Sequence, residues 1–239
     1  MENENSDIRK DDVLLCVDDE ENVLHSLTRT FRHAPFRVMT ASSGDEAIRI
    51  MENEPVRVLI SDQRMPGMEG TALLGKTRER WPHIIRIILS GYTDVPALLR
   101  AINVGEVYRF ISKPWDDEAL KKLVGRAMEQ SRVYEEMTAI SNILMNKGEK
   151  DNKVRIDVDN LGHAIKMKLS ESHHPLSTDQ ITDCLEKIFE VEENKGLNLM
   201  AGALERQNGK LTFSTEVKEG LELILEFPIA NGSGEERNG

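Results

Sequence analysis

The chain has 239 residues, a formal net charge of −11 and a hydrophobic fraction of 39%. This fraction is enough for a core, and the length allows one large domain or two small ones. The acidic balance argues against a general nucleic-acid surface, which needs a basic patch, so we do not expect nucleic acid as a partner. The two cysteines lie in apolar contexts and no apolar run approaches the ~20 residues of a membrane span, which predicts a cytoplasmic protein.

The first half alternates short apolar runs with helical patterns. Runs typical of buried strands cover 13–17, 36–41, 56–61, 84–89 and 107–112. Helical patterns cover 20–33, 44–53, 67–80, 93–104 and 115–147. Ser43 and Glu46 form a capping-box pattern in front of the second helix. The alternation predicts an α/β fold with a doubly wound, five-stranded parallel sheet covered by helices on both faces.

The pattern changes after the long helix 115–147. Alternating apolar residues predict two antiparallel pairs of strands, 154–158 with 165–169 and 211–215 with 221–227. Helical segments at 177–189 and 196–207 lie between these pairs. The second half is therefore predicted to be a small α/β sandwich domain.

The long helix carries a short apolar stripe. Val133, Met137, Ile140 and Leu144 recur at spacings of four, three and four residues, which resembles a heptad pattern. Two repeats leave two alternatives open, which are packing against a neighbouring domain and formation of a homodimer through the 115–147 helix.

Polar residues stand at the carboxyl ends of the predicted strands. Asp18 and Asp19 follow the first run, Asp62 the third, Ser90 the fourth and Lys113 the fifth. In an open parallel sheet these ends meet at one crevice, where ligands bind. Three carboxylates there require a cation, and hard oxygen ligands suit Mg²⁺. A phosphoryl group is the ligand that the lysine and the serine most easily explain.

Four segments carry a family resemblance. Val13–Glu21, Leu59–Gly70, Ile88–Gly91 and Phe110–Pro114 together resemble the receiver domain of two-component response regulators, with all polar landmarks in order. The resemblance implies a receiver-type sheet and a partner histidine kinase that supplies the phosphoryl group.

The resemblance also assigns roles to the acidic residues and the lysine. It makes Asp62 the phosphoacceptor, and it makes Asp19, Asp62 and the backbone carbonyl of Arg64 ligands of Mg²⁺. Asp18 would act through a metal-bound water, and Lys113 would pair with the phosphoryl oxygens.

A second group of residues is expected to respond to phosphorylation. By the same resemblance Ser90 would bind the phosphoryl group and Phe110 would turn inward, which forms a switch. Arg64 and Tyr92 are two residues beyond the acceptor and the switch hydroxyl, and they would form the rim of the site.

The second half resembles another family. Leu185–Glu190, Lys195–Leu199, Glu205–Thr215 and Gly220–Pro228 are similar to the end of histidine-kinase-type ATPase domains. By that resemblance Asn142, Asn146 and Gly196 are weak candidates for nucleotide contacts. The glycine loop that the family uses to approach phosphate is replaced by Ser170–Leu176, which lacks glycine and contains a proline. We therefore expect a degenerate domain without bound nucleotide.

These patterns predict a response regulator of a phosphorelay whose output is protein–protein interaction. The expected parts are a flexible terminus (1–11), a receiver (12–127), a helical linker (128–150), an output domain (151–229) and a disordered tail (230–239). We expect no enzymatic activity beyond the receiver's own phosphoryl transfer and dephosphorylation. The alternatives are a hybrid kinase-like protein that still binds ATP and a DNA-binding transcriptional regulator.

Overall fold

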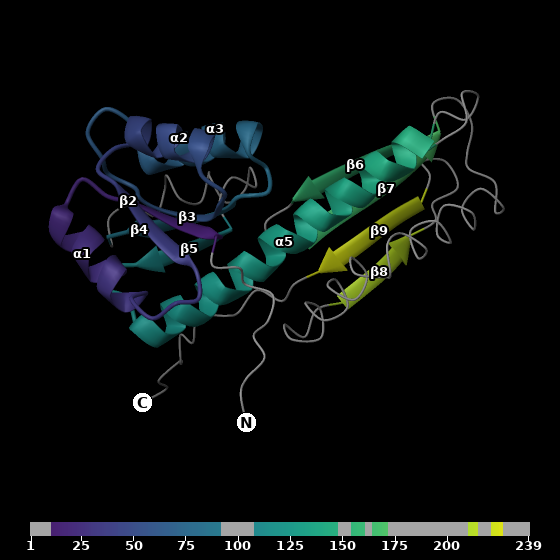
Figure 1. Cartoon of the computed structure of the whole chain (residues 1–239). Helices are drawn as coiled ribbons and strands as arrows, with labels where there is room; N and C mark the ends of the chain where they lie inside the picture. Colours follow the sequence, from purple (N-terminus) through teal and green to yellow (C-terminus); the bar gives the residue numbers. More distant parts are fainter. Residues whose placement is uncertain are drawn as a thin grey trace, which may run out of the picture.

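The structure is a computed structural model that contains two β-sheets and a long helix running beside both of them (Figure 1). It describes residues 11–91, 108–147, 154–160, 164–171, 210–214 and 221–226. The predicted helix 93–104, the helices 177–189 and 196–207, and the two termini lie outside the described residues.

The first sheet is parallel and has five strands in the order β2-β1-β3-β4-β5. The strands are β1 (Val13–Val17), β2 (Arg37–Ala41), β3 (Val56–Asp62), β4 (Ile85–Ser90) and β5 (Arg109–Ser112). This order confirms the doubly wound parallel sheet that the alternation of apolar runs and helices predicts. Because all five strands run in the same direction, their carboxyl ends lie along one edge of the sheet.

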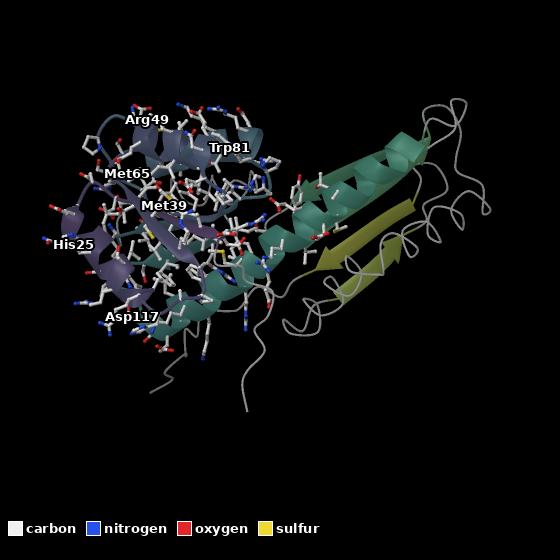
Figure 2. All side chains as sticks on the ribbon, viewed as in Figure 1. His25, Met39, Arg49, Met65, Trp81 and Asp117 are labelled. Carbon is white, nitrogen blue, oxygen red and sulfur yellow. The ribbon has the colours of Figure 1, made fainter. Side chains whose placement is uncertain are left out.

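Helices cover both faces of this sheet (Figure 1). They are α1 (Glu21–Thr30), α2 (Gly44–Asn53), α3 (Gly70–Arg80) and α5 (Asp117–Lys147). Alternate strand residues point to opposite faces, so Val13 and Leu15 pack with α2 and α3, whereas Leu14 and Cys16 pack with α1 and α5. Trp81 and Met65, labelled in Figure 2, belong to the first of these two cores.

Helices α3 and α5 begin three and two residues later than the sequence predicts. The segment before α3 contains Gly67, whose φ of +80° is left-handed and interrupts the predicted start at that residue. At α5 the side chain of Asp116 accepts a hydrogen bond from the backbone N–H of Ala119 at 2.7 Å, so the helix begins after this cap. Helix α2 has its predicted bounds, and the Ser43 hydroxyl accepts from the N–H of Glu46.

The second sheet is antiparallel and has the order β6-β7-β9-β8. Its strands are β6 (Val154–Asn160), β7 (Ala164–Glu171), β8 (Lys210–Ser214) and β9 (Leu221–Glu226). Both predicted strand pairs are present, β6 with β7 and β8 with β9. A third pairing, between β7 and β9, joins them into one sheet, and the sequence pattern does not predict it.

Helix α5 continues for 31 residues from the first sheet to a position beside β6 (Figure 1). Val133 and Met137, the first half of the apolar stripe, are fully buried within the chain. Their burial favours packing inside the chain over an open dimer seam, and dimerisation stays a prediction. Among the described helices, none combines the length and the apolar character that a membrane crossing requires.

A cluster of charged side chains fixes α5 where the strands begin. The carboxylate of Asp12, just before β1, accepts from Arg132 Nη2 at 2.6 Å and from Arg57 Nε at 3.1 Å. Arg57 also pairs with Glu135 of α5, and His83 Nε2 lies 4.0 Å from the same glutamate. Burial lowers the pKa of His83, and the positive charge of neighbouring arginines lowers it further, against the opposing effect of Glu135. The cluster ties α5 to the edge of the sheet opposite the strand carboxyl ends.

Replacement of Arg132 by methionine should destabilise the protein, because Asp12 and Arg132 are both buried and the substitution leaves a buried carboxylate without its partner in α5. We expect a loss of about 3 kcal/mol in the free energy of unfolding, measured in urea. Lys122→Met removes a positive charge from an exposed position of the same helix and should cost less than about 0.5 kcal/mol. Equal losses in the two variants would contradict a special role for the Asp12–Arg132 pair.

Candidate functional site

Side chains from three strands meet at the carboxyl edge of the parallel sheet. Lys113 Nζ lies 2.7 Å from Asp18 Oδ2 and 2.6 Å from Asp62 Oδ1. Asp18 follows β1, Asp62 ends β3 and Lys113 follows β5. The structure therefore brings together three of the residues that the strand-end pattern predicts to converge.

Each carboxylate also accepts a hydrogen bond from a nearby backbone N–H. The N–H of Glu20 donates to Asp18 Oδ1 at 2.9 Å, and the N–H of Arg64 donates to Asp62 Oδ2 at 2.6 Å. One oxygen of each group thus contacts the lysine, and the other contacts the loop that follows the strand. This arrangement fixes the orientation of both carboxylates.

The electrostatics of the site leave an excess of negative charge. Burial raises the pKa of Asp18, and its hydrogen bonds to Lys113 and Glu20 offset only part of that effect. Burial alone would lower the pKa of Lys113, but hydrogen bonds and charge from Asp18 and Asp62 outweigh it and raise that pKa. A single ammonium therefore serves two carboxylates, with the exposed Asp19 close by in the sequence. Additional positive charge would stabilise this arrangement.

The other predicted residues occupy different environments. Ser90 is buried at the end of β4, where its hydroxyl donates to the carbonyl of Gly91 at 3.0 Å, and its own carbonyl accepts from the N–H of Lys113 at 2.9 Å. Phe110 of β5 is half-buried against the core beneath α2 and α3. The side chain of Arg64 is exposed, whereas Tyr92 lies outside the described residues.

The candidates for nucleotide contacts remain predictions. Asn142 and Asn146 both belong to α5, four residues apart and therefore on one side of the helix, but the structure does not describe their side chains. Gly196 lies outside the described residues.

Within the described parts of the chain, no three histidine, cysteine or acidic side chains lie close enough together to hold a metal ion by themselves. The acidic residues are still chemically suited to Mg²⁺, because this ion commonly takes one or two carboxylates and completes its octahedron with water or phosphate oxygens. Asp19 and Asp62 therefore offer the carboxylate oxygens that Mg²⁺ takes, and Asp18 would contact the ion through one of its water molecules.

Sequence reasoning missed the residues that shape the loop between β3 and α3. The side-chain oxygen of Gln63 accepts from the N–H of Thr71 at 3.3 Å, and the N–H of Gly70 donates to the carbonyl of Gln63 at 3.0 Å. The sequence contains no local signal for these contacts, because Gly70 lies inside the predicted helical pattern 67–80 and glycine is common in turns of many kinds.

Comparison with known proteins places this site in a family. A profile of the response regulator receiver domain matches residues 14–125. The signal receiver domain of an HD domain-containing protein from Pseudomonas fluorescens Pf-5 is 30% identical with a TM-score of 0.52, over 55% of this chain and 96% of that one. Through these residues the chain belongs to the response regulator receiver family.

Proteins that are similar to this receiver domain are named for different activities. The hydrogenase transcriptional regulatory protein HoxA of Cupriavidus necator is 41% identical over 128 residues, which is 54% of this chain and 26% of HoxA. A structure described as adenylate cyclase from Rhodopirellula baltica is 31% identical with a TM-score of 0.51, over 59% of this chain and all of that one. The chain spans about a quarter of the length of the curated relatives it matches.

The comparisons support the predicted receiver domain but not the predicted output domain. They establish the receiver domain over residues 14–125. They give no support to a degenerate kinase-type ATPase domain in the second half, because the profile match ends at residue 125. The expectation that nucleic acid is not a partner is not supported either, since HoxA is named as a transcriptional regulatory protein.

Replacement of Asp18 by asparagine should raise the melting temperature in Mg²⁺-free buffer. The folded receiver domain raises the pKa of Asp18 above its ordinary value of 3.8. The folded domain therefore favours the protonated form of this carboxyl. The protonated carboxyl contributes fully to the free energy of unfolding below pH 3.8, and this contribution is lost as pH rises through the raised pKa. We expect the melting temperature to increase by about 2 to 4 °C at pH 8. A change of ~1 kcal/mol in the free energy of unfolding has this effect in a protein of this size.

The same measurement at lower pH provides the control for this variant. The advantage of Asp18→Asn over the wild type should shrink towards zero as pH falls below 3.8, the ordinary pKa, because Asp18 is then protonated in both the folded and the unfolded wild type. Asp45→Asn, at an exposed position in α2, should leave the melting temperature nearly unchanged at every pH. A melting temperature below that of the wild type at pH 8 would contradict the prediction.

Proposed function

We propose that this receiver domain accepts a phosphoryl group on Asp62 from a phosphorylated histidine of a partner kinase. The observation that carries the proposal is the position of Asp62, whose Oδ1 lies 2.6 Å from Lys113 Nζ at the carboxyl edge of the sheet. A bond would form between a carboxylate oxygen of Asp62 and phosphorus while the phosphorus–nitrogen bond to imidazole breaks. The imidazole leaves with the electron pair and takes up a proton, which makes it a good leaving group.

Mg²⁺ is the cofactor that this chemistry requires. Asp19, Asp62 and the backbone carbonyl of Arg64 would hold the ion, with Asp18 acting through a water molecule. When bound, the ion supplies positive charge that lets an anionic carboxylate approach an anionic phosphoryl group. Burial is the main cause of the raised pKa of Asp18, so a cation close to this carboxylate would favour its charged form.

The remaining residues are assigned to binding and signalling. Lys113 would contact the phosphoryl oxygens as a compact point charge. Ser90, at the end of the neighbouring strand, would move to hydrogen-bond the phosphoryl group, and Phe110 would turn inward to fill the space. Arg64 and Tyr92 would form the rim that limits access of water to the acyl phosphate.

Incubation with a small phosphodonor tests the acceptor assignment. In Mg²⁺ and acetyl phosphate, the wild type should gain the mass of one phosphoryl group in intact-protein mass spectrometry, and Asp62→Asn should gain none. Asp45→Asn removes an exposed carboxylate elsewhere and should be phosphorylated like the wild type. Lys113→Met should reduce the rate at least tenfold, because it removes ~1.4 kcal/mol or more of transition-state stabilisation. Phosphorylation of Asp62→Asn at the wild-type rate would refute the proposal.

For the second half we propose an output through protein–protein interaction by a degenerate ATPase-like domain. The antiparallel sheet β6-β7-β9-β8 supports a separate folded unit beyond the receiver domain. The segment Ser170–Leu176, which lacks glycine, argues against close approach of a nucleotide phosphate. The proposed boundaries remain 12–127 for the receiver, 128–150 for the linker and 151–229 for the output domain.

A transcriptional output is the second candidate, because HoxA is named as a transcriptional regulatory protein. The similarity covers only 26% of HoxA, so this chain's match does not reach most of that protein. Binding to duplex DNA that weakens steeply as salt rises would favour this candidate over the protein-interaction output.

Titration with ATP and Mg²⁺ separates a degenerate domain from an active one. Isothermal titration calorimetry of the full chain should show no binding tighter than about 1 mM, because the loop that approaches phosphate lacks glycine. Binding of Mg²⁺ alone at the receiver site is the internal control that the sample is active, and it is subtracted from the ATP titration. Micromolar affinity for ATP would instead favour the hybrid kinase-like alternative.

A further inference from the structure

The loop between β3 and α3 is closed by contacts between its two ends. The N–H of Gly70, the first residue of α3, donates to the carbonyl of Gln63 at 3.0 Å. The N–H of Gln63 donates in turn to the carbonyl of Leu89 in β4 at 3.0 Å. The start of α3 is thereby held directly over the end of β3, where Asp62 lies.

This closure leaves no room for a side chain at position 70. A Cβ atom built on Gly70 would lie 2.1 Å from the backbone carbonyl oxygen of Asp62 and 2.9 Å from Cδ1 of Ile88. The first contact is with backbone at the proposed acceptor itself, so an alanine there cannot be accommodated by a side-chain rotation. The start of α3 or the backbone of Asp62 has to move.

The same carbonyl is held from a second direction. The hydroxyl of Ser61, fully buried, donates to the Asp62 carbonyl oxygen at 2.9 Å. Within the closed loop, the N–H of Arg64 donates to Asp62 Oδ2 at 2.6 Å. The backbone carbonyl of Asp62 is therefore held by Ser61 and by the close packing at Gly70, and one carboxylate oxygen is held by the N–H of Arg64.

We propose that Gly70 and Ser61 are positioning residues for Asp62, and that they set the geometry of its carboxylate towards Mg²⁺ and Lys113. The proposal rests on the phosphoacceptor role of Asp62 given above. Mg²⁺ demands nearly ideal octahedral geometry at about 2.1 Å, so a shift of a few tenths of an ångström in one ligand weakens binding. Gly70 and Ser61 act through Asp62, and their loss should appear first in the affinity for the metal.

The matched comparison is Gly70→Ala against Gly125→Ala in the full chain. Both variants add one methyl group to a glycine of a helix, but a Cβ on Gly125 meets no atom within 4 Å. The probe is Mg²⁺ alone, titrated by calorimetry at a temperature where circular dichroism shows each variant fully folded. The second measurement is the Mg²⁺ concentration that gives half the maximal rate of phosphorylation by acetyl phosphate.

We expect Gly70→Ala to bind Mg²⁺ at least tenfold more weakly and to need correspondingly more Mg²⁺ for phosphorylation. Gly125→Ala should match the wild type in both measurements. A merely structural glycine would lower the melting temperature of Gly70→Ala but leave the Mg²⁺ affinity of the folded protein unchanged, and that result would overturn the proposal for Gly70.

Ser61→Ala tests the positioning of Asp62 without adding a side-chain atom. This variant tests the proposal even if Gly70→Ala does not fold. We expect about threefold to tenfold weaker Mg²⁺ binding, because one hydrogen bond to the carbonyl contributes about 1 kcal/mol. Unchanged affinity would overturn the positioning role. Wild type and Asp62→Asn are measured in parallel, because a wild type that is not phosphorylated would refute the acceptor role instead.

Discussion

The site of this receiver domain depends on one interaction, in which two carboxylates share a single lysine ammonium group. Asp18 and Asp62 come from strands that are neighbours in the sheet, and Lys113 reaches both from the far edge strand. The parallel sheet, with its strands in this order, brings these three ends together. The fold therefore stabilises an arrangement that is short of positive charge, and this shortage makes the site receptive to a cation.

The alternation of side chains along the strands explains how such a charged site coexists with a stable core. Leu14 and Cys16 pack into the core on one face of the sheet, and Val13, Leu15 and Val17 pack into the core on the other. Strand β1 is therefore apolar throughout its length. The acidic residues Asp12 and Asp18 flank this strand, one before its first residue and one after its last. The two apolar layers bury the strands on both sides, and the sheet edge alone carries the chemistry.

Local patterns predict the five strands of the first sheet and the identity of Asp18, Asp62 and Lys113, because each signal is contained in a few consecutive residues. The charged cluster around Asp12 and Arg132 is not predictable in this way, since these residues lie 120 positions apart and each resembles a solvated charge. The tight packing at Gly70 is likewise a property of the folded backbone. The pairing of β7 with β9 depends on long-range contacts that periodicity does not encode.

The fixed attachment of α5 gives the long helix the mechanics of a lever. From Arg132 to Lys147 the helix extends for about 22 Å, and a continuous helix transmits rotation along its axis with little bending. A tilt of about 5° at the charged cluster would therefore displace Lys147 by about 2 Å. The strands β1 and β3 connect the cluster to the acidic site, since each carries Asp12 or Arg57 near one end and Asp18 or Asp62 at the other. A sub-ångström change in the sheet that tilted α5 at the charged cluster would therefore appear near the second sheet as a larger displacement.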